Sequence, residues 1–330
     1  MLRLLPEYAD AQLVRSRDPA VLDKCDIVVD VGGQYDGAKR FDHHQREFAE
    51  TFSPKHKTKL SSAGLVYKHF GSQLVAARLQ LPPADAATHP SVQLVLHKLY
   101  DSFIEALDAN DNGIAAYPAD IEPAYETGGI TLPQLVGGLN RPSWKPEPSD
   151  QVEEDTLFLR ASQLVGEAFE RTLDHHALAW LPAREFVESA LQKRTKHDAD
   201  GRILVLERLV PWKDHLFSLE EAMGIGGEQG KEQDKEQDKQ GKGQGGKQPL
   251  YVLYPESSTR PGWRIQCVPA ARNSFASRRP LPEAWRGLRD AELSTAAGID
   301  GCVFVHASGF TGGNKTFDGV VAMAHKALAM

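Results

Sequence analysis

The chain has 330 residues, enough for two domains of ordinary size, each with its own hydrophobic core. Its 41% hydrophobic and 25% charged residues are typical of a globular protein, and a net charge of −7 excludes a surface that is basic throughout. No run of about 18 apolar residues occurs, so no membrane-spanning helix is predicted. Only three cysteines are present, far apart, which favours a reducing compartment over a disulfide framework or a structural zinc site.

The N-terminal half alternates strand and helix patterns, as an α/β domain does. The continuous apolar run at 26–32 ends at two glycines and predicts a buried parallel strand. Helices are predicted after Ser61 and over 91–112 and 151–178. The Gly-, Pro- and Ser-rich stretch at 137–150 interrupts this periodicity. We therefore predict an α/β domain at 1–140, followed by a helical connector at 141–200.

Residues 201–330 are predicted to form a smaller mixed α/β domain that binds substrate. A cleft is predicted between this domain and the first domain. Short apolar runs predict its strands, and a last helix is predicted near 319–330. Within this domain, residues 226–246 contain only Gly, Lys, Glu, Gln and Asp, with KEQD twice in tandem. A segment without apolar side chains cannot offset its ordering entropy, so a disordered surface insertion is predicted there.

Asp30 is the first candidate for a functional site. It lies inside the apolar strand, where a carboxylate is costly unless a partner compensates it, and near the strand's C-terminal end. Ligands of open α/β sheets bind at that end of the strands. The alternative is that Asp30 caps the turn at Gly32 and Gly33.

Asp42, His43 and His44 place three metal-competent side chains in succession. Consecutive residues of an extended segment point in opposite directions, so the two histidines are expected to have different tasks, one binding a metal and the other facing a substrate. Imidazole and carboxylate donors suit Mn²⁺ or Mg²⁺. The alternative is a polar turn exposed to solvent.

Asp111 is the third candidate, at the end of the helix predicted over 91–112. At about 100° per residue, Asp111 falls within about 50° of the centre of the apolar stripe, whereas Asp108 is about 110° away. A carboxylate that faces the core needs a partner, so Asp111 is the preferred ligand. A second Asp-His-His, at 174–176, stands in a helical pattern that spreads its side chains, so a solvated helix face is predicted there.

Near the C-terminus, an apolar strand at 302–306 runs into a glycine-rich stretch and then a helix. Glycines and a helix N-terminus allow backbone N–H groups to approach a phosphate, and Lys315 adds positive charge. The alternative is a tight structural turn. Upstream, five arginines lie between 272 and 289 with Phe275 and Trp285 among them, a mixture that suits contact with an anionic polymer.

The order of these motifs resembles that of the DHH phosphoesterase superfamily. Longer stretches are similar to the melanocyte proliferating gene 1 protein family, and they cover nearly the whole chain apart from the insertion. These stretches are VVDVGG at 28–33, RFDHHQREF at 40–48, TKLSSAGLVYKHFG at 58–71, FIEALDANDNGI at 103–114, LPEAWRGLRDAELS at 281–294 and GCVFVHASGFTGGNKT at 301–316.

The resemblance implies a DHH-type parallel sheet in the N-terminal domain and a metal-dependent phosphodiesterase, a 3′–5′ RNA exonuclease of mitochondria and nucleus. Older descriptions of the family give a metal-dependent protein hydrolase. By motif, Asp30 would bridge two metal ions, and His43 and Asp111 would bind one of them. His44 would contact the scissile phosphate, and Asp42 would orient the neighbouring imidazole. The implied substrate-binding residues are His306, Ser308, Gly312, Gly313, Lys315 and Arg279.

One family motif has no counterpart in this sequence. The resemblance implies a first strand that ends in His-x-Asp, just ahead of a helix similar to LRLLPEYADA, and this chain starts inside that helix. The first strand and half of the metal ligands are therefore expected to be missing, so that one Mn²⁺ or Mg²⁺ site is expected instead of two. No presequence is present, and localisation follows from the resemblance alone. The alternatives are a catalytically inactive RNA-binding or scaffold protein and a hydrolase of small phosphate substrates.

Overall fold

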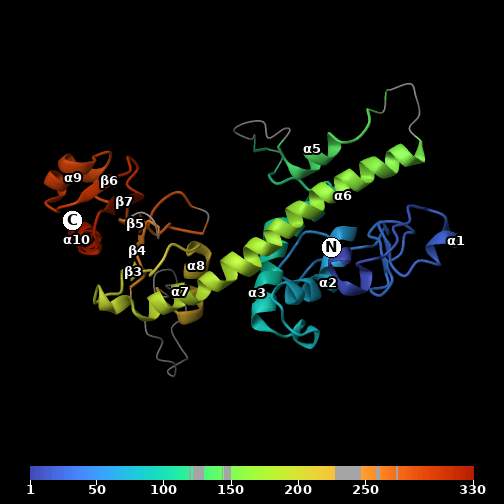
Figure 1. The fold of residues 1–330 in the computed structure, drawn as a ribbon, viewed down its shortest axis with the longest axis horizontal. Coiled ribbons are helices and arrows are strands. Elements are labelled where there is room, and N and C mark those ends of the chain that lie inside the picture. The colour runs from blue at the N-terminus through green and yellow to red at the C-terminus, as the bar shows by residue number, and fades with distance from the viewer. Residues whose placement is uncertain are drawn as a thin grey trace. The chain divides into compact units, whose positions relative to one another are not determined.

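The computed structural model describes residues 1–118, 120–121, 130–142, 144, 150–226, 247–257, 261–272 and 274–330. The chain divides into two compact units, Met1–Leu181 and Pro182–Met330. The first contains a two-stranded parallel sheet and the second a mixed sheet of five strands, which confirms the mixed α/β class. Figure 1 labels the strands of the five-stranded sheet. The division between the units falls inside the connector predicted at 141–200, and the predicted domain boundaries stay predictions.

The first unit consists of helices around a short parallel sheet. Its strands are β1 (Val28–Val29) and β2 (Arg40–Phe41), in parallel register with Val28 opposite Arg40. Its helical elements are η1 (Leu2–Leu4), η2 (Pro6–Tyr8), α1 (Pro19–Leu22), α2 (Ser62–Arg78), η3 (Pro83–Asp85), α3 (Pro90–Leu99), η4 (Tyr100–Ile104), α4 (Glu105–Asp111), α5 (Leu132–Gly137), α6 (Gln151–Asp174) and η5 (His175–Trp180).

The core of the first unit lies between α2, α3 and the C-terminal part of α6. Leu65 and Leu74 of α2 and Leu99 of α3 are buried there against Phe169 of α6. Helix α2 begins where its sequence predicts, because the Ser61 side chain accepts a hydrogen bond from the Gly64 N–H and caps the first turn. The predicted helix over 91–112 is confirmed as α3, η4 and α4 in continuous succession, but η4 is a π-helical turn.

The second unit has helices on both faces of its sheet. The strand order is β3-β4-β5-β7-β6, in which only β3 and β4 are parallel. The strands are β3 (Ile203–Val205), β4 (Tyr251–Pro255), β5 (Trp263–Cys267), β6 (Cys302–Val305) and β7 (Thr311–Asn314). The helical elements are α7 (Leu181–Gln192), η6 (Arg194–Lys196), α8 (Lys213–Met223), η7 (Glu283–Trp285), α9 (Asp290–Ala297) and α10 (Phe317–Ala329).

The side chains of β4 point alternately to the two faces of the sheet. Each face packs against its own group of helices. Tyr251 and Leu253 pack with residues of α9 and α10, whereas Val252 packs with residues of α7 and α8. This is the period-two alternation expected of a strand that is covered on both faces. Apart from Gly226, the predicted insertion at 226–246 lies outside the described residues. Among the helices that the structure describes, none has the length and apolar character needed to cross a membrane.

The glycine-rich stretch after 302–306 differs from the expected phosphate-binding loop. It forms a β-hairpin, in which Gly312 and Gly313 belong to β7, between β5 and β6. A Cβ on Gly312 would lie 2.9 Å from the Phe304 carbonyl oxygen, and one on Gly313 would lie 3.1 Å from the Trp263 carbonyl oxygen. Close packing between neighbouring strands therefore explains why both positions are occupied by glycine.

Candidate metal centre

The carboxyl ends of β1 and β2 bring two of the sequence motifs together. Because the strands are parallel, Asp30 after β1 and Asp42–His44 after β2 emerge at the same edge. Asp30 has a left-handed backbone, with φ of 64°, which aspartate tolerates better than most residues. It does not cap the glycine turn, because the Gly33 N–H donates to Asp42 Oδ2 at 2.6 Å instead.

His43 is the centre of the group. Its Nε2 lies 3.1 Å from Asp111 Oδ2, and its Nδ1 lies 3.9 Å from Asp30 Oδ1. The imidazole is buried, with a 7% exposed side chain, whereas the two carboxylates are open to solvent. Asp30 and His43 belong, with Asp42 and His44, to a group whose donor atoms lie within 4.8 Å of one another, and Asp111 of α4 lies beside His43. Imidazole and carboxylate donors of this kind suit a divalent ion of the Mn²⁺ or Mg²⁺ kind.

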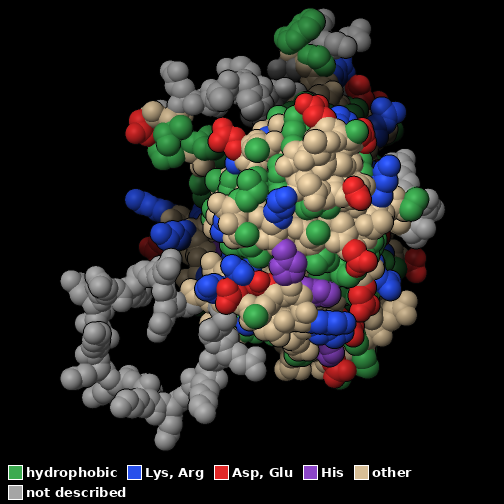
Figure 2. Space-filling model, turned by 90° about the vertical axis from the view of Figure 1, so that its left-hand side faces the viewer, with side chains coloured by type: hydrophobic (Ala, Val, Ile, Leu, Met, Phe, Trp, Pro, Cys, Tyr) green, Lys and Arg blue, Asp and Glu red, His purple; other side chains and the backbone are tan. Residues whose placement is uncertain are grey.

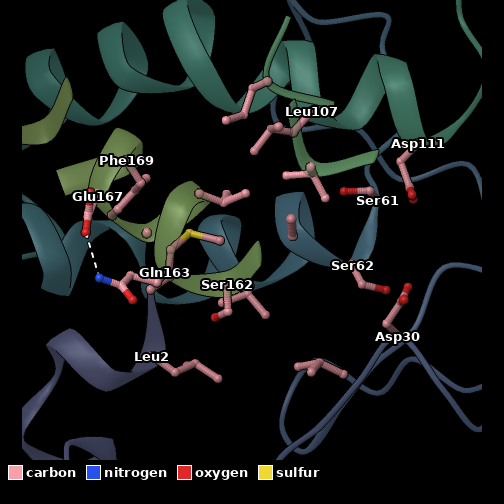
Figure 3. A pocket seen from close by; sticks show the side chains of 18 of the residues that line it. Leu2, Asp30, Ser61, Ser62, Leu107, Asp111, Ser162, Gln163, Glu167 and Phe169 are labelled. Atoms are coloured by element: carbon pink, nitrogen blue, oxygen red, sulfur yellow. Dashed lines mark hydrogen bonds between the residues drawn. The ribbon is translucent and has the colours of Figure 1, made fainter. Parts of the chain in front are cut away.

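The N-terminus of α2 sets the orientation of His43. The Ser62 backbone N–H donates to His43 Nδ1 at 3.1 Å, so in the neutral imidazole the proton is on Nε2 and faces Asp111. An ion held at Nε2 requires this proton to leave. Ser62 Oγ, also 3.1 Å from Nδ1, is placed to accept a hydrogen bond from the other tautomer. Figure 3 shows Ser62 beside Asp30 at this end of the site.

Asp42 and His44 form a second, connected pair. Asp42 is 2% exposed and accepts from His44 Nδ1 at 2.6 Å. Burial acts to raise the pKa of Asp42, but the hydrogen bonds from His44 and Gly33 outweigh it, so that this pKa is lowered. The hydrogen bond to Asp42 raises the pKa of His44, whose side chain is 60% exposed. With Asp42 and His43 both buried, the motif is not the exposed polar turn of the alternative interpretation.

The prediction that His43 and His44 point in opposite directions is wrong. Their rings stack with centroids 4.3 Å apart and an interplanar angle of 28°. The physical reason is local, since β2 ends at Phe41 and the strand alternation ends with it. The two imidazoles nevertheless differ in environment, one buried beside carboxylates and the other exposed.

The prediction that Asp111 faces the core is also wrong. The buried carboxylate is that of Asp108, which is 0% exposed and accepts from Ser61 N at 2.9 Å, Ser61 Oγ at 2.7 Å and Tyr100 OH at 2.9 Å. Burial raises the pKa of Asp108, against the effect of these hydrogen bonds. The π-helical turn in η4 is wider than an α-helical turn, so it changes the angle at which later residues leave the helix axis. A helical projection at 100° per residue therefore places Asp108 and Asp111 on the wrong faces.

Sequence reasoning missed the supporting roles of Ser61, Ser62 and Asp108. Ser61 caps α2 and binds Asp108, while the next residue, Ser62, contacts His43. The signal in the sequence was the serine pair ahead of an apolar helical pattern, which predicts a helix N-terminus but not what that terminus holds.

A cavity of about 860 Å³ opens beside the candidate ligands, wholly within the first unit. Figure 3 shows Asp30, Asp111, Ser61 and Ser62 at one end of it. The rest of the wall is largely apolar, and its residues include Leu2, Val66, Leu107, Val136, Leu159 and Phe169. The site is therefore accessible from a sizeable hollow and not sealed in the core.

The predicted substrate-binding residues of the second unit lie on and beside the β6–β7 hairpin. His306 and Ser308 are exposed in its turn, where His306 Nδ1 and Ser308 Oγ are 2.9 Å apart. Lys315 is exposed just after β7, whereas Arg279 is half-buried before η7. The roles of these residues, and of Gly312 and Gly313, stay predictions.

Part of the arginine-rich segment at 272–289 makes contacts inside the second unit. Arg278 forms a buried ion pair with Glu220, at 2.6 and 2.7 Å, and Trp285 is only 1% exposed. Phe275 is fully exposed. On the face of the molecule in Figure 2, basic and acidic side chains are interspersed and do not gather into one basic patch. Arg278 is engaged by Glu220, and the anionic-polymer contact expected at 272–289 stays a prediction.

The second Asp-His-His forms no metal-binding group among the residues that the structure describes. Asp174 pairs with Arg78 at 2.7 Å, and His176 Nε2 lies 2.8 Å from Ser102 Oγ. The expected solvated face is wrong for His176, which is 5% exposed, because the π-helical η5 turns it inward.

The comparisons with known proteins confirm the resemblance. The MYG1 exonuclease family model, described as uncharacterised protein family UPF0160, matches residues 1–328. The chain belongs to this family. It is 46% identical to the MYG1 protein C694.04c of Schizosaccharomyces pombe over 328 residues, which cover 99% of this chain and 91% of that protein.

Two further relatives show the same degree of similarity. The MYG1 protein of Dictyostelium discoideum is 44% identical, over 99% of this chain and 91% of that protein. The protein named MYG1 exonuclease in Homo sapiens is 44% identical, over 100% of this chain and 81% of that protein. No solved structure gives a significant match to the chain.

Proposed function

We propose that this protein is a divalent-metal-dependent phosphodiesterase that acts as a 3′–5′ exonuclease on RNA, with a first unit of the DHH type. The observation that carries the proposal is the grouping of Asp30, Asp42, His43 and His44 at the carboxyl ends of two parallel strands, with Asp111 at the end of α4 beside His43. The membership of a family whose human relative is named an exonuclease supports it. Localisation in mitochondria and the nucleus stays a prediction.

Asp30, His43 and Asp111 are the residues that would hold the ion, and they supply one nitrogen and two carboxylates. Mn²⁺ or Mg²⁺ bound there would polarise a phosphoryl oxygen and lower the pKa of a bound water. The N-terminus of α2 holds the His43 ring in place, and an ion at Nε2 would require the Nε2 proton to leave, with Ser62 Oγ placed to accept a hydrogen bond from Nδ1–H.

His44 is the group suited to the phosphate. Its raised pKa keeps more of the imidazolium at neutral pH, and its exposed ring lies against that of His43. An imidazolium in this position can donate a hydrogen bond to a phosphate oxygen or a proton to the leaving oxygen. Asp42 acts through His44, because it fixes the Nδ1–H and leaves Nε2 free to face the substrate.

The alternative is a catalytically inactive RNA-binding protein. The reason for it is the small number of protein ligands for metal ions. By the roles that the resemblance implies, Asp30, His43 and Asp111 are three protein ligands, enough for one ion, whereas paired ions both activate the nucleophile and stabilise the leaving oxygen. We therefore expect metal binding with slow turnover in the chain as given. A hydrolase of small phosphate substrates is the other alternative.

The test combines Mn²⁺ titration with release of labelled nucleotides from 3′-labelled RNA. His43→Gln and Asp111→Asn are expected to lose the Mn²⁺ ion and all nucleotide release. His44→Gln is expected to keep the ion and lose release, which separates substrate contact from metal binding. Asp174→Asn, in the second Asp-His-His, is the matched control and should change neither.

Three outcomes overturn the proposal or favour an alternative. Unchanged Mn²⁺ binding in His43→Gln would show that the ion is held elsewhere. Binding of RNA by the metal-loaded protein without any nucleotide release would favour the inactive RNA-binding protein. Turnover of dinucleotides but not of longer RNA would favour the small-substrate hydrolase.

A further inference from the structure

A second group of metal-competent side chains lies elsewhere in the first unit. His56, Asp101 and Glu105 each offer one donor atom, and these three atoms lie within 4.8 Å of one another. His56 belongs to the segment that leads into α2, Asp101 to η4 and Glu105 to the start of α4. None of the three belongs to the candidate centre of Asp30, His43 and Asp111.

One ring nitrogen of His56 contacts a neighbouring polar side chain, as is usual for a histidine that binds a metal. Ser53 Oγ lies 2.8 Å from its Nδ1, which leaves Nε2 for the carboxylates, 2.8 Å from Asp101 Oδ1. The ring is packed edge-on against Phe52 and Tyr100, with centroids 5.4 and 4.7 Å away, and its side chain is 12% exposed. A ring fixed on one nitrogen by a hydrogen bond and on its faces by packing is pre-organised for a ligand at the other nitrogen.

The two carboxylates bring negative charge to the group. Asp101 Oδ1 pairs with His56 Nε2. Glu105 Oε1 accepts a hydrogen bond from Thr58 Oγ1 at 2.8 Å, which fixes the carboxylate beside the His56 segment. Asp101 is 56% exposed, so the group is open to an ion from solvent.

We propose that His56, Asp101 and Glu105 bind a divalent ion of the Zn²⁺ class, at a site separate from the candidate metal centre and independent of the proposed function. One imidazole and two carboxylates are ordinary zinc ligands, and water completes a tetrahedron. Zn²⁺ also binds such N and O donors more tightly than Mn²⁺ or Mg²⁺ does.

The ion would connect two parts of the first unit that also support the candidate centre. It would join the segment at 53–58 to η4 and α4, and a few residues farther along that segment are Ser61 and Ser62. Ser61 binds Asp108, and Ser62 orients His43. We therefore assign the site a structural role, in which it fixes the connection between α4 and the N-terminus of α2.

The test is calorimetric titration of the chelator-treated full chain with ZnCl₂, in the unmodified protein and in variants of each site. His56→Gln and Glu105→Gln keep polar side chains in place but lose the imidazole nitrogen or the charge. Each is expected to lose one equivalent of Zn²⁺ or to weaken it by at least about tenfold. His43→Gln should keep that equivalent, which separates this site from the candidate centre. His175→Gln, an exposed histidine beside Asp174, is the matched control.

Crystals grown with ZnCl₂ provide a second measurement, an anomalous-scattering peak between His56 Nε2 and the two carboxylates. Unchanged Zn²⁺ stoichiometry and affinity in both His56→Gln and Glu105→Gln, or crystals without that peak, would overturn the proposal. If His43→Gln alone loses Zn²⁺, the ion belongs to the candidate centre and the second site does not exist. Circular dichroism melting of each variant checks that it is folded when titrated.

Discussion

Replacement of Gly64 by alanine tests whether the buried Asp108 carboxylate holds the N-terminus of α2. A Cβ on Gly64 would lie 2.3 and 2.4 Å from the two Asp108 carboxylate oxygens, where ordinary contacts begin at 3.4 Å. The carboxylate must therefore withdraw by about 1 Å, which is enough to break its hydrogen bonds with Ser61 N and Oγ.

The cost follows from the groups that lose their partners. Each buried donor left without a partner costs about 1–3 kcal/mol, and the gain from glycine to alanine in a helix is about 1 kcal/mol. The net loss is about 3 kcal/mol, which for a unit of this size lowers the melting temperature by roughly 6–12 °C. Thermal melting followed by circular dichroism measures this directly.

Gly166→Ala is the matched control, because Gly166 lies within α6 and a Cβ there would meet nothing within 4 Å. It should leave the melting temperature unchanged or raise it slightly. The double variant Gly64→Ala with Asp108→Ala should be no less stable than Asp108→Ala alone, since the clash partner is gone. A Gly64→Ala protein that melts within about 2 °C of the unmodified chain would refute the role given to Asp108.

Three further predictions concern the Asp42–His44 pair, the buried Arg278–Glu220 pair and the segment at 226–246. His44 should titrate above its usual pKa by NMR and return toward about 6.5 in Asp42→Asn; an unshifted His44 would contradict the ion pair. The stabilisation from this pair is complete between the ordinary pKa values of the two groups, 3.8 for aspartate and 6.5 for histidine, and is lost as pH falls through the lowered pKa of Asp42 or rises through the raised pKa of His44. Glu220→Ala should destabilise the second unit by about 3–5 kcal/mol in urea melts, because it leaves the buried Arg278 guanidinium unpaired. Glu221→Ala, whose side chain is 84% exposed, should have little effect. Replacement of 226–246 by a short turn should leave the melting temperature and Mn²⁺ binding unchanged, since loop closure changes by only about 0.6 kcal/mol per doubling of length; a large fall in melting temperature would contradict this.

Much of the local structure could be predicted from the sequence alone. The apolar run before Asp30, the serines ahead of α2 and the long periodic stretch at 91–112 each determine a strand or helix through near-neighbour patterns. The resemblance to a known family brought Asp30, His43 and Asp111 together in the prediction. Parallel strands present their carboxyl ends at one edge, which accounts for Asp30 and Asp42–His44, whereas Asp111 lies at the end of α4.

Only the tertiary structure decided which carboxylate is buried and what the distal glycines do. A π-helical turn changes the phase of a helix without a clear mark in the sequence, and the exchange of Asp108 for Asp111 as the buried residue depends on that turn. Gly312 and Gly313 resemble a phosphate loop in sequence, but their need for glycine comes from the Phe304 and Trp263 carbonyls of adjacent strands. Both facts depend on contacts between segments far apart in the chain or on small changes in helical twist, and neither is encoded in the spacing of nearby residues.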